Sequence, residues 1–189
     1  ADGTVSTVAD GRNNVTTFSN WKRGIPRLMT FADTTTKSAE VDDLGQITWV
    51  IDENGYKTCY AFDVMGRLSK ITYPSNANPG TCGTDQWNPL VRSFAKRAAN
   101  DPDLDFDLGP NHWIERVNTG NGYTVTHYDA LWRPSVVERY DATDAATKVA
   151  TLTRSATRYD SNGAVVYQSY PTQNLTTWKT IAPGTYTEY

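Results

Sequence analysis

The residues of this chain best suited to catalysis are its two histidines, His112 and His127. His127 and Asp129 stand two apart in a strand-like run, so their side chains could share one face, as a base and its orienting carboxylate do. A nucleophilic site needs a third positioned group, and the sequence has no Gly-x-Ser-x-Gly, His-Glu-x-x-His or Cys-x-x-Cys motif. We therefore expect His127 to be a half-exposed strand residue and the chain to have no catalytic residues and no hydrolase activity.

Acidic and apolar residues alternate over 101–107 in a pattern that superficially resembles a calcium loop. An EF-hand loop has Gly at its sixth position and Glu at its twelfth, where this chain has Phe106 and His112. An amphipathic strand that turns Leu104, Phe106 and Leu108 inward explains the run better. The sequence thus predicts neither a metal site nor a cofactor.

Aromatic residues are the remaining candidates for a binding surface. Their rings could stack on a sugar, but Trp and Tyr also pack between sheet layers, and no polar cluster converges on any Trp in sequence. We expect packing on the sheet and keep a glycan site as the alternative. The chain has eleven tyrosines and six tryptophans, at Trp21, Trp49, Trp87, Trp113, Trp132 and Trp178.

Two cysteines, Cys59 and Cys82, are too few for a disulfide-rich scaffold. They could pair and anchor the Pro/Gly-rich loop over 75–90, and in an exported protein such a bond would stabilise the fold by roughly 3 kcal/mol. The sequence leaves open whether they pair or are unrelated residues of a strand and a loop.

Length and charge narrow the class of protein. The 189 residues are most simply one domain. Acids and bases are interspersed at a net charge of −3, so we expect no nucleic-acid partner, and no apolar run is long enough to span a membrane. No signal peptide is present, and the first residue is Ala1 rather than Met, which indicates a processed protein or a piece of a longer one.

A short phrase recurs along the chain: an aromatic or apolar residue, an Asp, two or three variable residues, then Gly-Arg-Leu or a relative. The clearest copy spans 62–68, and others begin at Val41-Asp42, Tyr128-Asp129 and Tyr159-Asp160, with a faint fifth at 18–24. A spacing of ~22 residues indicates an array of supersecondary units and places two degenerate copies near Asp85 and Asp107. The wider last interval implies an insertion over 141–150.

Strands and turns explain the phrase. Alternation predicts strands over 47–51, 56–62 and 67–73, joined by turns at 52–55 and 63–66. The Asp accepts hydrogen bonds from backbone N–H groups two residues on, and the Gly takes the left-handed conformation. The same logic predicts turns at 129–132 and 160–163, between strands over 123–128, 133–140, 151–159 and 164–170. It also predicts a first hairpin over 4–18. The segment 90–99 fits a helix or a strand, and the fold is all-β and antiparallel.

These residues resemble the YD-repeat, or RHS-repeat, family, whose phrase runs Gly-x-x-Thr-x-Tyr-x-Tyr-Asp-x-x-Gly-Arg-Leu. The later units match more loosely: Tyr128, Asp129 and Arg133 fit, but Trp132 stands at the glycine, and Tyr159, Asp160 and Gly163 fit, but Ala164 stands at the arginine. The resemblance implies strand-turn-strand repeats wound into a spiral β-sheet. The residues of the first unit that match are Gly55, Thr58, Tyr60, Phe62, Asp63, Gly66, Arg67 and Leu68, with Phe62 in place of Tyr.

The resemblance also implies a function. In long members the spiral closes into a shell around a toxic domain, and relatives are exported or surface-associated bacterial proteins. This chain lacks the family's Gly/Pro/Asp-rich core segment with its autocleavage aspartates, so it looks like a fragment or a short stand-alone array. We expect a non-catalytic, secreted or cell-surface shell segment that encloses or presents a toxin or effector domain. The alternative is a module that binds a glycan or a partner protein through exposed Trp and Tyr.

The partners expected from this interpretation follow from its open strand edges. An adjoining repeat of a parent protein would pair with the strands at 4–8 and 176–186, or further copies of the chain would associate there edge to edge. The toxin domain of the parent protein is a further expected partner.

Overall fold

The structure is a computed structural model that describes residues 3–97, 106, 108, 109, 111–173, 175 and 183–187. Within these residues it contains fourteen β-strands and one short helix. Every strand pairing is antiparallel, and the order of strands in the sheet follows their order in the sequence. The predicted all-β, antiparallel fold is therefore confirmed. The chain divides into two compact units, Ala1–Leu90 and Val91–Tyr189.

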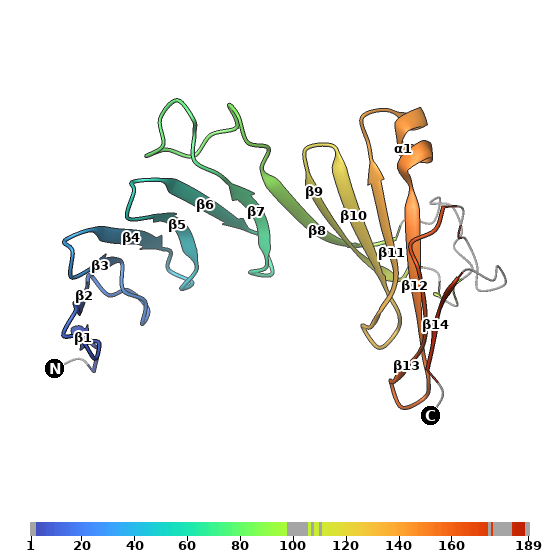
Figure 1. The fold of residues 1–189 in the computed structure, drawn as a ribbon, viewed down its shortest axis with the longest axis horizontal. Helices are drawn as coiled ribbons and strands as arrows, with labels where there is room; N and C mark the ends of the chain where they lie inside the picture. The colour runs from blue at the N-terminus through green and yellow to red at the C-terminus, as the bar shows by residue number, and fades with distance from the viewer. Residues whose placement is uncertain are drawn as a thin grey trace. The chain divides into compact units, whose positions relative to one another are not determined.

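Unit 1 is a meander in which each strand pairs with the next (Figure 1). The strands predicted over 47–51, 56–62 and 67–73 are found to within a few residues, because apolar or aromatic residues alternate with polar ones between Asp- and Gly-containing turns. The strands Leu28–Thr30 and Thr36–Val41 were not predicted. The first strand is shorter than predicted and begins at Thr7 rather than near residue 4. The strands are β1 (Thr7–Ala9), β2 (Val15–Ser19), β3 (Leu28–Thr30), β4 (Thr36–Val41), β5 (Ile47–Ile51), β6 (Lys57–Phe62) and β7 (Leu68–Thr72).

Unit 2 continues the same up-and-down pattern with longer strands. The segment over 90–99, which fitted a helix or a strand, forms β8 up to Lys96, and residues 98–99 lie outside the described part. The elements are β8 (Leu90–Lys96), β9 (Trp113–Thr119), β10 (Gly122–Tyr128), β11 (Pro134–Asp141), α1 (Ala145–Thr151), β12 (Thr153–Tyr159), β13 (Val165–Ser169) and β14 (Gly184–Tyr186).

The helix α1 fills the predicted insertion and was not itself predicted. Asp144 caps it, since its side chain accepts a hydrogen bond from the Thr147 backbone N–H. No residue of this seven-residue helix is buried. Periodicity could not reveal it, because a helix this short with no apolar face leaves no pattern of period 3.6.

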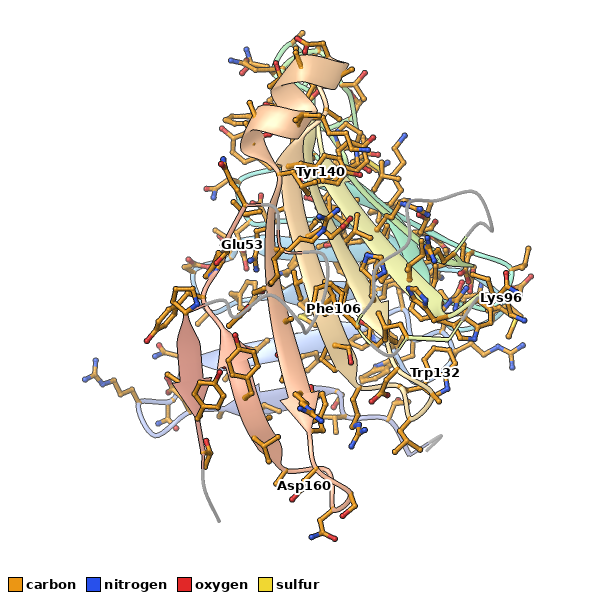
Figure 2. The ribbon with its side chains drawn as sticks, turned by 90° about the vertical axis from the view of Figure 1, so that its right-hand side faces the viewer. Glu53, Lys96, Phe106, Trp132, Tyr140 and Asp160 are labelled. Carbon is orange, nitrogen blue, oxygen red and sulfur yellow. A yellow bond between two sulfur atoms is a disulfide. The ribbon has the colours of Figure 1, made fainter. Side chains whose placement is uncertain are left out.

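The core of unit 2 consists of Phe106, Val136, Ala156 and Leu175, with Leu108 packed against them. Figure 2 shows Phe106 lying over the middle of the strands of this unit. The inward orientation predicted for Phe106 and Leu108 is therefore confirmed, although neither lies in a strand. The rest of 101–107, including Leu104 and Asp107, lies outside the described residues, as does 176–182 of the predicted C-terminal edge strand.

Candidate functional site

Asp63 organises the turn between β6 and β7. Its Oδ1 accepts hydrogen bonds from the backbone N–H groups of Met65 and Arg67, both at 2.9 Å, and its Oδ2 accepts one from Arg67 Nε at 2.7 Å. The N–H of Gly66 donates to the Asp63 carbonyl at 2.9 Å, with Gly66 at a φ of 77°. The backbone hydrogen bond from Arg67, followed by that from its side chain, lowers the pKa of Asp63. One ionised carboxylate thus closes the turn.

The same turn occurs six times in the described part of the chain. In each copy an Asp Oδ1 accepts hydrogen bonds from the backbone N–H groups of the second and fourth following residues, and the third following residue has a positive φ. The predicted turns at 52–55, 63–66, 129–132 and 160–163 are confirmed. The six aspartates are Asp10, Asp42, Asp52, Asp63, Asp129 and Asp160, and the residues of positive φ are Asn13, Gly45, Gly55, Gly66, Trp132 and Gly163.

A β-bulge flanks four of these turns, and its extra residue lies on the strand after the turn: Thr48, Ser69, Ser135 or Val166. The register shifts immediately before Val41, Phe62, Tyr128 and Tyr159, the residues that precede Asp in the repeated phrase. A bulge increases local twist and re-aims a side chain, so the aromatic or apolar residue and the Asp act as one bulge-and-turn unit. The remaining motif residues Thr58, Tyr60 and Leu68 are half-buried strand residues.

In each unit one pair of repeat turns lies close together. Gln46, at the end of the Asp42 turn, donates from Nε2 to the Gly66 carbonyl at 3.2 Å. Arg133 holds the same place in the Asp129 turn, and a Cβ added at Gly163 of the next turn would lie 3.7 Å from its Nη1. In both units, therefore, the side chain that follows one Asp turn lies beside the glycine of another Asp turn, and in unit 1 the Asp52 turn comes between the two in sequence. Figure 1 shows the β10–β11 and β12–β13 turns at the same end of their strands.

Two predicted copies are not of this kind. In the faint copy at 18–24 the second position is Ser19 in β2, and the chain reverses instead through a bridge between Lys22 and Ile25. The Asp85 carboxylate forms no repeat turn: it accepts hydrogen bonds from the backbone N–H groups of Asn76 and Ala77. A weak match of residues suggested the first copy and spacing the second, and neither has the Asp-x-x-Gly pattern that closes the turn.

The cysteines, whose pairing the sequence left open, form the disulfide Cys59–Cys82, with their Cα atoms 6.1 Å apart. The bond ties β6 to the 75–90 loop. A bridge between Pro74 and Cys82 and a hydrogen bond from Lys57 N–H to the Pro79 carbonyl at 2.8 Å hold the same loop. The loop is thus fixed at several points along its length.

Trp132 occupies a glycine position in its turn, at a φ of 63°. A bulky residue with positive φ is an outlier, and the surroundings of Trp132 account for it. Its ring stacks near Phe94 and Trp113, with centroids 5.5 Å and 5.6 Å away, and Lys96 lies over Trp113. The ring is 53% exposed. Figure 2 shows Trp132 and Lys96 on the same side of unit 2.

The histidines form a buried polar chain. His127 is 5% exposed, so the predicted half-exposed position is wrong. Its Nδ1 lies 2.8 Å from His112 Nε2, and its Nε2 lies 3.7 Å from Glu138 Oε2. Arg154 Nε donates to Glu138 Oε1 at 2.6 Å. Asp129 is occupied in its turn, so no His–Asp pair forms.

The protonation of this chain of groups follows from hydrogen-bond chemistry. The Gly109 carbonyl can only accept, so His112 Nδ1, 3.0 Å away, carries a proton toward it. Burial raises the pKa of Glu138, but the His127 ring and Arg154 outweigh it and lower that pKa to about 2. The ionised carboxylate of Glu138 is therefore stabilised inside the sheet by these two neighbours. Sequence could not reveal this arrangement, because it depends on strands β9 to β12 being neighbours.

Comparison with protein-family models and with curated proteins finds no match to this chain. Among the residues that the structure describes, no helix is long and apolar enough to cross a membrane. Across the same residues, no group of three or more His, Cys, Asp or Glu side chains is arranged to hold a metal ion.

Proposed function

We propose that this chain is a non-catalytic structural module of a bacterial YD-repeat protein, a segment of β-sheet wall that encloses or presents a toxin or effector domain. The observation that carries the proposal is the repeated Asp turn. Six copies share one hydrogen-bond pattern, and in each unit one pair of turns is in contact, through Gln46 in unit 1 and Arg133 in unit 2. Such nearest-neighbour coupling is typical of repeat arrays.

The burial pattern of unit 1 also supports the proposal that it is a segment of a larger β-sheet. Among its described residues, Val41 is the one apolar side chain that is fully buried, whereas Val8, Val15 and Met65 are exposed. A single sheet layer with so little of its apolar surface covered gains stability when other strands or another domain cover it. We propose that further repeats, the enclosed domain or other copies of the chain provide this cover.

A secreted or cell-surface location fits this function. Disulfides persist in oxidising compartments and are rare in the bacterial cytoplasm. The Cys59–Cys82 bond therefore supports export of the protein.

The polar groups that resemble catalytic ones are poorly placed for chemistry, which supports a non-catalytic role. His112 and His127 are buried, and Glu138 is held by Arg154. A general base must reach the proton that it removes, so a sequestered pair has no access to a substrate. We expect no turnover of ester, peptide or glycoside substrates, and turnover that is lost in His127→Ala would contradict the proposal.

Association through the unpaired edge of β1 is the direct test of the proposal that the chain is a segment of a larger β-sheet. β1 pairs with β2 through one side only, among the residues described, and an unpaired edge templates strand addition. We expect light scattering to show association that rises with protein concentration and is reduced in Val8→Lys, because a charge on the edge opposes pairing. Val64→Lys is the matched control, since Val64 is fully exposed in a turn away from the edge. A strict monomer, or equal effects of the two variants, would contradict edge pairing.

The second candidate function is a glycan-binding surface on unit 2, formed by Phe94, Trp113 and Trp132. The observation that favours it is the unfavourable backbone of Trp132, which keeps an exposed indole beside two other rings. Flat aromatic faces of this kind stack against sugar rings. We propose binding of neutral oligosaccharides here, tested on an oligosaccharide array with wild type and Trp132→Ala. Equal binding by the two proteins would exclude this surface.

A further inference from the structure

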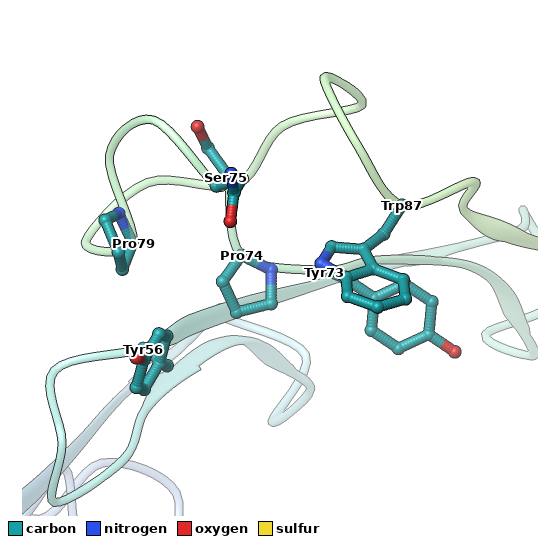
Figure 3. A pocket seen from close by; sticks show the side chains of 7 residues that line it. Tyr56, Tyr73, Pro74, Ser75, Pro79 and Trp87 are labelled. Atoms are coloured by element: carbon teal, nitrogen blue, oxygen red, sulfur yellow. The ribbon is translucent and has the colours of Figure 1, made fainter.

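A pocket of about 390 Å³ opens on unit 1 beside the disulfide-tied loop. Figure 3 shows Pro74 at its base, with Tyr56 and Pro79 at one end and the rings of Tyr73 and Trp87 at the other. Tyr56 and Trp87 are 48% and 58% exposed. This volume lies in the range of small-ligand sites, and its aromatic walls are accessible to a partner.

The pocket wall is held in place without a ligand. Asp85 Oδ2 accepts hydrogen bonds from Asn76 N–H at 2.9 Å, Ala77 N–H at 3.1 Å and Ser75 Oγ at 3.1 Å. The Ser75 N–H donates to the Thr81 carbonyl at 2.9 Å. Together with the disulfide, these bonds fix the loop that carries the two prolines. A preformed site of this kind binds at a lower entropic cost than a mobile loop.

The lining is neutral and combines hydrogen-bond donors and acceptors, because the tyrosine hydroxyls and the Asn76 amide can do both. No charged side chain is among its described residues. The Ser75 hydroxyl is occupied, because it donates to Asp85 and accepts from Asn78 N–H. The Trp87 indole N–H and the Tyr56 hydroxyl bond to no other described residue. In Figure 3 the indole nitrogen of Trp87 points toward Pro74. Trp can only donate, so the Trp87 end of the pocket suits a ligand that presents an acceptor beside apolar rings.

We infer that this pocket binds a proline-rich peptide segment in the polyproline II conformation. Proline has no N–H, so such a peptide offers carbonyl acceptors without donors of its own and places pyrrolidine rings against aromatic faces. Aromatic-lined grooves recognise these segments because the extended helix is already formed before binding. A sugar fits less well at the Trp87 end, because its hydroxyls also donate, the indole has no acceptor for them, and the Ser75 hydroxyl and Asp85 carboxylate are engaged within the loop. This inference is independent of the wall function proposed above.

The test is fluorescence anisotropy with a labelled peptide of about ten prolines, a length that forms several turns of this helix. The intact chain is titrated against it, with a Gly/Ser peptide of equal length and a neutral oligosaccharide as the other probes. We expect saturable binding of the proline peptide, no binding of the Gly/Ser peptide, and no displacement of the proline peptide by the oligosaccharide, whose proposed surface lies in unit 2. Trp87→Ala is expected to weaken it at least about tenfold, because buried aromatic anchors dominate such interfaces. Trp87→Phe keeps a ring but loses the N–H donor, so its affinity for the peptide is expected to lie between those of the wild type and Trp87→Ala.

Tyr170→Ala is the matched control, because Tyr170 is an aromatic residue of unit 2 with a similar exposure of 56%. It is expected to bind the proline peptide like the wild type. Circular dichroism of each variant checks that the fold is retained, which the exposure of Trp87 favours. Absence of binding by the wild type, equal binding by Trp87→Ala, or binding of the oligosaccharide in place of the peptide would each overturn the inference.

Discussion

Gly55 and Gly66 allow two reasons for glycine in the repeat turn to be tested separately: its backbone conformation and its close contact with a neighbouring side chain. Both have positive φ, at 83° and 77°. A Cβ added at Gly55 meets no atom within 4 Å, whereas one added at Gly66 lies 3.0 Å from Gln46 Nε2. Gly11, which also lies in unit 1, has no positive φ and equally open surroundings. Gly55→Ala therefore introduces backbone strain alone, and Gly66→Ala introduces strain together with a close contact to Gln46. Gly11→Ala introduces neither.

The expected magnitudes follow from this comparison. Replacing Gly by Ala restricts the unfolded chain, which by itself stabilises a protein by about 0.4–1 kcal/mol. This contribution is common to all three variants, so Gly11→Ala measures it. The left-handed conformation costs an L-residue about 1–2 kcal/mol, and we expect Gly55→Ala to be less stable than Gly11→Ala by that amount.

The neighbour adds to the effect at Gly66. Because the end of Gln46 is flexible, it can move aside, but it then loses its hydrogen bond to the Gly66 carbonyl. We expect Gly66→Ala to lose about 0.5–1 kcal/mol more than Gly55→Ala. In a Gln46→Ala background this additional loss should disappear.

Urea unfolding followed by circular dichroism measures these differences. All three glycines belong to unit 1, so they report on the same part of the chain. If Gly55→Ala and Gly66→Ala matched Gly11→Ala to within ~0.3 kcal/mol, an error typical of comparing independent sites, the left-handed turn would not exist in solution.

Three further predictions concern single contacts. Trp132→Gly should be more stable in urea than Trp132→Ala by about 1 kcal/mol, because both lose the ring stacking but only Gly relieves the positive φ; equal stability would refute backbone strain there. The lowered pKa of Glu138 stabilises the fold above pH ~4.5, and this contribution is lost as the pH falls toward about 2, so Glu138→Gln should have a weaker acid dependence than the wild type between these values; parallel acid-unfolding curves would contradict the buried ion pair. Replacing both Cys59 and Cys82 by Ala should cost roughly 3 kcal/mol and remove any effect of dithiothreitol on the melting temperature; a reductant effect that persisted would show that another bond is involved.

The repeat turn was predictable because its interactions are local. The Asp63 carboxylate bonds to N–H groups two and four residues away, and the glycine between them provides the conformation. All of these atoms lie within one short segment, so residue types and spacing are enough to specify the turn. Strand alternation is local in the same sense, which is why the antiparallel all-β fold followed from the sequence.

Contacts between distant segments depended on the tertiary structure. The pairing of Cys59 with Cys82 requires the 75–90 loop to return to β6, and the contact of His112 with His127 requires the register of β9 against β10. The position of Trp132 shows the difference most directly. The positive φ of this turn position favours glycine, but Phe94 and Trp113 from other strands stabilise an aromatic ring there. The packing of side chains from separate strands outweighs the local preference, and residue spacing contains no information about which strands become neighbours.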